Sequence, residues 1–139
     1  MKDFRKVNLA GFDLRDMILK DVDFRRVNLS NANLAGKNIE NCDFTCANLQ
    51  GANFNGSNLR GTNFRGANMS GADLRNVNLE GADLSGTKLE NANLDGANLS
   101  KTYIRGTDIR GVDFKNVKLK DAIIKLVYDG EFKRISTLS

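Results

Sequence analysis

The 139-residue chain has the length of one ordinary domain, but it contains no Pro, Trp or His. Hydrophobic residues make up 40% of the chain and charged residues 27%, which indicates a folded protein rather than a disordered one. The net charge of +4 comes from 21 basic and 17 acidic residues without a basic tail or an acidic block, so charge alone argues only weakly for nucleic acid.

Neither a membrane span nor a secretion signal is expected from the sequence. No run approaches the roughly 18 apolar residues of a transmembrane helix, and the opening residues MKDFRKVNLAGFDL lack an apolar signal stretch. We therefore expect a cytoplasmic protein without membrane contact. Cys42 and Cys46 have no His or further Cys nearby, so we expect free thiols, no metal site and no cofactor.

A period of five residues runs through the chain. Every fifth residue from Phe4 to Ile124 is Leu, Phe, Ile or Met, which gives 25 central positions without a gap. The residue two before the centre is usually Ala, Val or Thr, and the residue one before it is Asn or Asp in 20 units. Of the 13 glycines, 12 lie two residues after a centre.

This period matches neither the two-residue repeat of a strand nor the 3.6-residue repeat of a helix. In an extended unit the central residue and the residue two before it point the same way, so one large and one small side chain share an interior. Gly or Asn then tolerates the left-handed dihedral angles of a sharp corner. A corner in every unit coils the chain into a tube whose coils bond to one another.

The units ANLAG, ADLRN, ADLSG and ANLDG resemble the A(D/N)LXX motif of the pentapeptide repeat family, and the resemblance covers residues 2–124. It implies an all-β fold, a right-handed quadrilateral β-helix with 20 residues per coil and about six coils. We assign residues 1–124 to this domain and residues 125–139 to a C-terminal cap or tail. The cap is either a hairpin at Asp129–Gly130 or a short helix, and it would cover the last coil with Leu126, Val127, Phe132 and Ile135.

Residues 20 apart then form columns along the tube. The central residues Phe4, Phe24, Phe44 and Phe64 share one column, which predicts a stacked core. Outside that wall lies a basic column with Arg5, Arg25, Arg65 and Arg105, beside an acidic column that begins with Asp3, Asp23 and Asp43. The two columns form either a solvated ladder of ion pairs or a stripe that binds a phosphate or carboxylate partner.

A second wall carries Asn28, Asn48 and Asn68 just before its centres and has no charge over four coils. It is either an ordinary solvated wall or a flat, polar contact surface for a protein.

Several residues depart from the pattern. Lys37 occupies an inward position, which predicts a local bulge because a buried ammonium group is costly. Phe12, Met17 and Ile18 are expected to add apolar volume to the first coils. Tyr103 and Ile123 place apolar surface outside near the other end, and we interpret the departures at both ends as end effects.

The sequence argues against an enzyme, since it has no His, no Gly-x-Ser-x-Gly elbow and no phosphate-binding loop. Our first hypothesis is a non-catalytic protein-interaction or scaffolding module. The alternative, suggested by the family resemblance, is a DNA-mimic modulator of DNA gyrase or topoisomerase that protects it from quinolones or toxins. The net basic charge argues against this mimic, and paired charges with only two tyrosines argue against direct nucleic-acid binding. Because terminal coils leave core and backbone unpaired, we expect either a homodimer through one end of the solenoid or a partner protein that covers the open coil.

Overall fold

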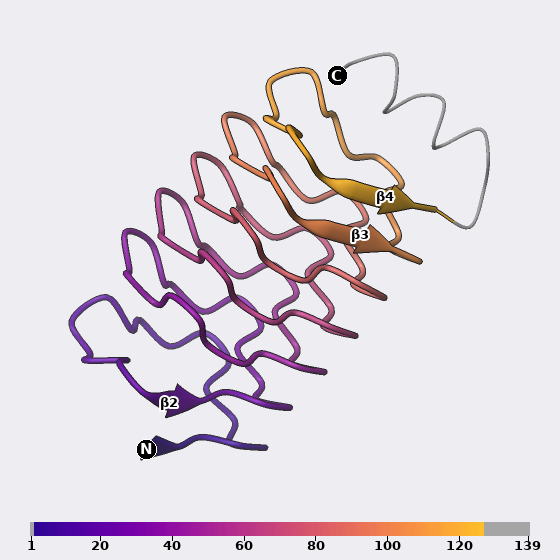
Figure 1. Ribbon diagram of the computed structural model, residues 1–139. Coiled ribbons are helices and arrows are strands. Elements are labelled where there is room, and N and C mark those ends of the chain that lie inside the picture. Colours follow the sequence, from indigo (N-terminus) through magenta and orange to yellow (C-terminus); the bar gives the residue numbers. More distant parts are fainter. Residues whose placement is uncertain (1, 127–139) are drawn as a thin grey trace.

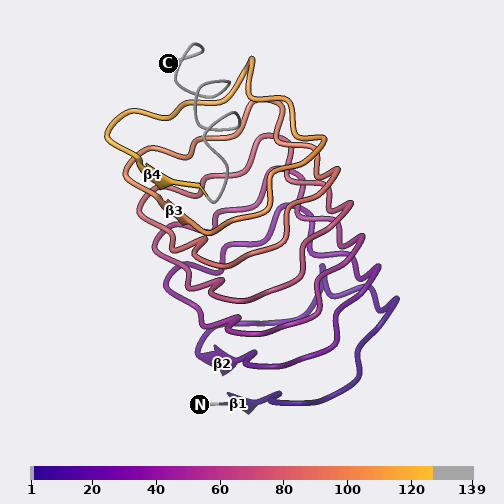
Figure 2. The same cartoon turned by 90° about the vertical axis from the view of Figure 1, so that its right-hand side faces the viewer.

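The computed structural model describes residues 2–126, which wind into a tube of stacked coils (Figure 1). Seen from the side, each coil lies on the one before it as a separate layer (Figure 2). Residues 20 apart pair in parallel register, and the pairs continue from Asp3 to Asp23 and in further steps of 20 to Ile123. The fold is the predicted right-handed quadrilateral β-helix.

Four short strands lie on the wall that carries the phenylalanine column. Strand β1 (Lys2–Asp3) pairs in parallel with β2 (Val22–Asp23), and β3 (Tyr103–Arg105) pairs in parallel with β4 (Ile123–Lys125). Between them the coils are joined by isolated parallel pairs. Of the predicted cap, residues 125 and 126 are described, and Leu126 packs partly buried against the core. The rest of the predicted cap lies outside the described residues.

Each regular unit bonds to the coil above and to the coil below. In one unit, the Asn53 N–H donates to the Ala32 carbonyl at 2.9 Å, while the next N–H, of Phe54, donates to the Asp73 carbonyl at 2.8 Å. Alternate backbone groups therefore point along the tube in opposite directions, and neighbouring coils satisfy them. This bonding fixes the 20-residue register.

The corners between units require positive φ. After the centre Leu49, for example, Gly51 has φ of +67° and the Ala52 N–H donates back to the Leu49 carbonyl at 3.0 Å. Such a turn, with positive φ at its third residue, favours Gly or Asn. Twelve glycines and ten other residues adopt positive φ, so 22 of the 24 corner positions between residues 6 and 121 do so. The two exceptions are Asp16 and Asn116.

The predicted phenylalanine column is a stacked core from Phe24 to Phe64, whereas the partly buried Phe4 ring meets Phe24 edge to face at 6.0 Å between centroids. The Phe24 and Phe44 rings stack at 4.5 Å between centroids, and Phe44 and Phe64 stack at 5.3 Å. Phe54, from the opposite wall of the tube, meets Phe44 edge to face, with 6.1 Å between the ring centroids. Small residues two before most centres complete the packing, so the tube has a continuous apolar interior.

The backbone ladder opens between the first two coils near the irregular corner at Asp16. Among the described residues, no backbone hydrogen bond joins 18–20 to 38–40. The Lys37 side chain fills part of this opening, because its Nζ donates to the Met17 carbonyl and, at 3.1 Å, to the Arg15 carbonyl. The predicted bulge at Lys37 is wrong. Its own coil keeps its register through the Asn38–Asn58 pair, and the ammonium group finds its acceptors in the Met17 and Arg15 carbonyls of the coil below.

The expectation that Phe12, Met17 and Ile18 fill the first coils is also wrong. Their exposed fractions are 55%, 37% and 76%. Side chains two before a centre rest on the preceding coil, as the Thr107 hydroxyl does when it donates to the Leu84 carbonyl at 2.7 Å. In the first described coil Phe12 and Met17 have no coil beneath them, and Ile18, one before its centre, stands at an outward position, so the three form an apolar, exposed end.

The inward hydroxyl groups differ in how well they are paired. Thr62, Thr87, Thr102 and Thr107 are buried, and each donates to a backbone carbonyl. Ser57 is also buried, but its Oγ has no hydrogen-bond partner among the described residues. An unpaired buried hydroxyl costs roughly 1–3 kcal/mol.

We expect Ser57→Ala to raise the free energy of unfolding by about 1 kcal/mol, because it removes this hydroxyl from a position where other units have Ala. Thr87→Val is the matched control and should lower stability, since the Thr87 hydroxyl donates to the Phe64 carbonyl at 2.9 Å. Urea denaturation followed by circular dichroism measures both changes. A lower midpoint for Ser57→Ala would contradict the prediction.

Candidate functional site

The asparagines of the uncharged wall are part of the backbone scaffold. The side-chain Oδ1 atoms of Asn28, Asn48 and Asn68 accept the N–H groups of the residues two further on, at 3.1, 3.2 and 3.1 Å. Parallel pairing brings the three residues into one column, as the 20-residue spacing predicts. A partner at this wall would meet half-buried amide groups whose oxygen already accepts one backbone hydrogen bond.

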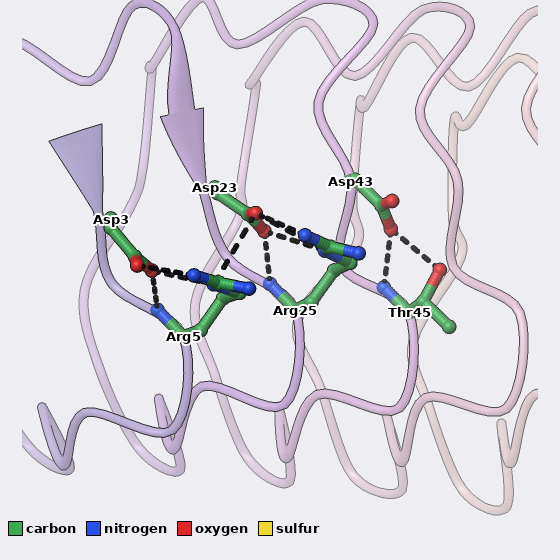
Figure 3. A network of polar contacts seen from close by, with 6 residues as sticks. All are labelled: Asp3, Arg5, Asp23, Arg25, Asp43 and Thr45. Atoms are coloured by element: carbon green, nitrogen blue, oxygen red, sulfur yellow. Dashed lines mark hydrogen bonds and ion pairs between the residues drawn. The ribbon is translucent and has the colours of Figure 1, made fainter. Parts of the chain in front are cut away.

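At the N-terminal end of the basic column, arginines are paired with aspartates. Arg5 donates to Asp3 through Nε at 2.9 Å and through its terminal nitrogen at 2.7 Å. Arg25 makes the same fork with Asp23, at 3.1 and 2.8 Å (Figure 3). The Arg5 Nε atom also lies 3.8 Å from the Asp23 Oδ2 atom, so the two pairs connect into a ladder along the wall. For Arg5 and Arg25 the ion-pair hypothesis describes the structure.

These forks lower the pKa values of the aspartates. Hydrogen bonds from the Arg5 side chain hold the pKa of Asp3 well below its usual range. The Arg25 side chain likewise lowers the pKa of Asp23, although burial of that carboxyl opposes the shift. On another wall, the Arg15 side chain lowers the pKa of Asp13 to about 2. Each carboxylate also accepts a backbone N–H, so charge pairing and turn geometry reinforce one another.

The fork follows the sequence pattern Asp-x-Arg wherever it occurs in the chain. The same geometry recurs at Asp13–Arg15, Asp73–Arg75 and Asp108–Arg110. Arginine in this position is therefore a general surface feature of the tube, and it does not by itself mark a binding stripe.

Arg65 and Arg105 differ from the arginines below them in the column. The residue two before Arg65 is Asn63, and its nearest carboxylate is Asp83, 3.8 Å from Nε. The residue two before Arg105 is Tyr103, and the guanidinium carbon lies 5.2 Å from the centre of that ring. Together with Ser85, which stands between them, these residues line a depression of about 330 Å³. The predicted column thus divides into a paired half and a less paired half.

Exposed apolar groups lie beside this depression. Tyr103 in β3 pairs with Ile123 in β4, and their exposed fractions are 40% and 47%. Sequence reasoning treated both as end effects and did not connect them with the arginines. The signal was present in the sequence, because a unit that replaces Asp by Tyr before Arg105 removes the carboxylate of the fork and adds an aromatic ring in one step.

A larger depression, of about 710 Å³, is lined by residues between 20 and 25 and between 38 and 43, next to the opening in the backbone ladder. It is lined by several carboxylates, but within residues 2–126 no three His, Cys, Asp or Glu side chains gather closely enough to hold a metal ion. Cys42 and Cys46 are free thiols, and burial raises the pKa of the Cys42 thiol to about 11. This region therefore offers no activated nucleophile at Cys42.

Residues 3–36, 42–81 and 82–121 match the family described as Pentapeptide repeats, in eight copies. The chain belongs to the pentapeptide repeat family. No curated protein matches this pentapeptide repeat protein significantly. Over residues 2–126 it has no helix with the length and apolar character needed to cross a membrane.

Several solved structures are similar to this pentapeptide repeat protein. HetL, involved in heterocyst differentiation regulation in the cyanobacterium Nostoc sp. strain PCC 7120, is 20% identical, with 89% of this chain and 85% of that chain covered and a TM-score of 0.46. Rfr23 from the cyanobacterium Cyanothece 51142 is 31% identical, with 92% and 88% covered and a TM-score of 0.45. A trypsin-treated variant of QnrB1, a plasmid-mediated fluoroquinolone resistance protein, is 19% identical, with 97% and 81% covered and a TM-score of 0.37.

From the arginine forks we predict how the stability of the fold changes at acidic pH. Because the pKa of Asp13 in the folded protein, about 2, lies below its ordinary value of 3.8, the pair stabilises the fold above about pH 4. That contribution is lost as the pH falls from about 4 to about 2. Asp13→Asn, which keeps the acceptor for the backbone N–H, should therefore lose less stability over this range than the unchanged protein.

Urea midpoints measured at pH 7, 4 and 2.5 in low salt test this expectation. Asp43→Asn is the matched control, because Asp43 contacts Thr45 and has no arginine two residues further on. If both variants reduced the acid sensitivity equally, the role of the arginine fork would be refuted.

Proposed function

We propose that this pentapeptide repeat protein is a non-catalytic protein-interaction or scaffolding module. The observation that carries the proposal is the surface around Arg65 and Arg105, where two arginines outside any Asp-x-Arg fork lie beside exposed Tyr103 and Ile123. Tyrosine and arginine are enriched at the energetic centres of protein interfaces. The interior supports a rigid scaffold, since its large side chains pack in one continuous column.

The arrangement of charge argues against the DNA-mimic alternative. A mimic of DNA needs an extended acidic surface, whereas Asp3, Asp13 and Asp23 are each forked by an arginine. Forked carboxylates present a nearly neutral pair to a partner rather than a phosphate-like charge. The net charge of +4 points the same way.

Two assays test the proposed function together. We expect the immobilised full chain to retain specific proteins from a cell extract in physiological salt, identified by mass spectrometry against a heat-denatured control. We also expect the chain neither to inhibit DNA gyrase supercoiling nor to protect the enzyme from a quinolone at micromolar concentration. Retention of no protein would contradict the module, and an effect on gyrase would favour the mimic.

We further propose that a second copy covers the apolar first coil. Phe12, Met17 and Ile18 are exposed there together with Val7. The first described coil also carries backbone groups on its lower edge that a coil beneath it would bond, as occurs higher in the tube. Two such ends can bury their apolar side chains against one another.

Sedimentation equilibrium is expected to show a dimer that the double variant Phe12→Ser/Ile18→Ser converts to a monomer. Ile123→Ser, which removes an exposed apolar residue from the other end of the tube, is the matched control and should leave the dimer intact. A monomeric unchanged protein at tens of micromolar would remove this proposal.

A further inference from the structure

The second half of the basic column carries charge that the tube itself does not balance. Of the charged side chains in the two neighbouring columns from residue 63 to residue 125, Arg65, Arg105 and Lys125 are cationic and Asp83 is anionic. Asp83 lies 3.8 Å from Arg65, and its Oδ1 accepts the Ser85 N–H at 2.9 Å. Within residues 2–126, Arg105 and Lys125 form no ion pair. The surface therefore has a local excess of positive charge.

Ser85 makes room between the two arginines. In the first two coils this position holds Arg5 and Arg25, whose side chains lie along the wall and fork with their own aspartates. The short Ser85 side chain leaves the depression of about 330 Å³ between Arg65 and Arg105. These two residues are two coils apart, roughly 10 Å at the spacing of paired strands. A single carboxylate held between long guanidinium side chains fits such a span.

The rest of the surface defines what must lie next to that carboxylate. Tyr103 supports Arg105 from one side through its ring, which keeps the guanidinium oriented. Ile123 continues the apolar strip beside Tyr103 across the β3–β4 pair. An extended acidic peptide with an apolar or aromatic side chain beside its carboxylate would satisfy both features. Asp83 also lines the depression and repels any anion there, so the surface suits one carboxylate bound between the two arginines better than a row of closely spaced phosphates. The arginines further down the column, which a nucleic-acid backbone would need as well, are already forked.

We propose that the depression between Arg65 and Arg105 is the recognition site for an acidic segment of a partner protein. Arg105 and Arg65 bind a Glu or Asp carboxylate of the segment, and Tyr103 with Ile123 packs against a neighbouring apolar side chain. The site rests on the proposed interaction function and specifies the chemistry of the partner.

Titration of the isotope-labelled full chain with a defined peptide, acetyl-Gly-Glu-Phe-Glu-Gly-amide, tests the site by nuclear magnetic resonance. The Nε–Hε signals of Arg65 and Arg105 should shift and saturate, while those of the forked Arg15 and Arg75 should not. The double variant Arg65→Gln/Arg105→Gln should weaken binding about tenfold or more, because it removes both guanidinium groups that bond the carboxylate. The matched variant Arg15→Gln/Arg75→Gln removes the same charge and should change affinity less than twofold.

Three results would overturn the site. The first is equal shifts at all four arginines, and the second is equal binding of the peptide with Gln in place of Glu. The third is tighter binding of inorganic phosphate or duplex DNA than of the peptide, which would assign the surface to phosphate groups. Circular dichroism of each variant confirms that the fold is intact.

Failure of this site and failure of the interaction function give different results. If the Arg65→Gln/Arg105→Gln chain retains the same proteins from the extract as the unchanged chain, the scaffold function stands and this site is wrong. If the peptide binds as expected but no protein is retained, the site chemistry stands and the interaction function is wrong.

Discussion

The structure depends on a turn of the backbone into the left-handed region at every fifth residue. Each turn ends one extended unit and begins the next, and four of them bring the chain back under itself so that coils bond in a 20-residue register. At the two corners that lack positive φ, the hydrogen bonding between coils departs from this register. Near Asp16 the coils separate, and near Asn116 the Gly96 N–H reaches the carbonyl of Asn116 itself, one residue beyond the usual offset.

The Asn or Asp before each centre links this backbone to the surface. Its Oδ1 holds the N–H two residues on, a task that both residue types perform equally well, as Asn53 and Asp73 do at 2.9 and 3.1 Å. The fold therefore leaves the choice of charge open at these positions. An Asp with an Arg two residues further on forms a fork without net charge. Replacing either residue by a neutral one leaves the charge of the other unpaired while the coil is kept. Surface chemistry can thus vary along a wall while the tube stays constant.

The periodic part of the molecule was predictable from sequence because each periodic residue has one local task. The phenylalanine stack, the inward threonines and the register all follow from the five-residue period. Predictions failed where a residue's surroundings are set by a different coil. Lys37 reaches carbonyls of the coil below, and Phe12 is exposed because side chains at its position rest on a preceding coil. The sequence contains the difference between Arg5 and Arg65, since Asp3 stands two residues before one and Asn63 two residues before the other. It could be interpreted only once the structure showed that an Asp at that position forms a fork with the Arg.

The opening between the first two coils has a consequence for how the protein unfolds. In a stack where each coil contacts only its neighbours, a joint that lacks part of its hydrogen bonding is where separation starts. The first coil is then expected to detach as a unit while the phenylalanine stack above it persists. Amide hydrogen exchange along the chain would follow a gradient, fastest before residue 20 and slowest in the middle coils, so the molecule would behave as a sequence of layers with separate opening energies.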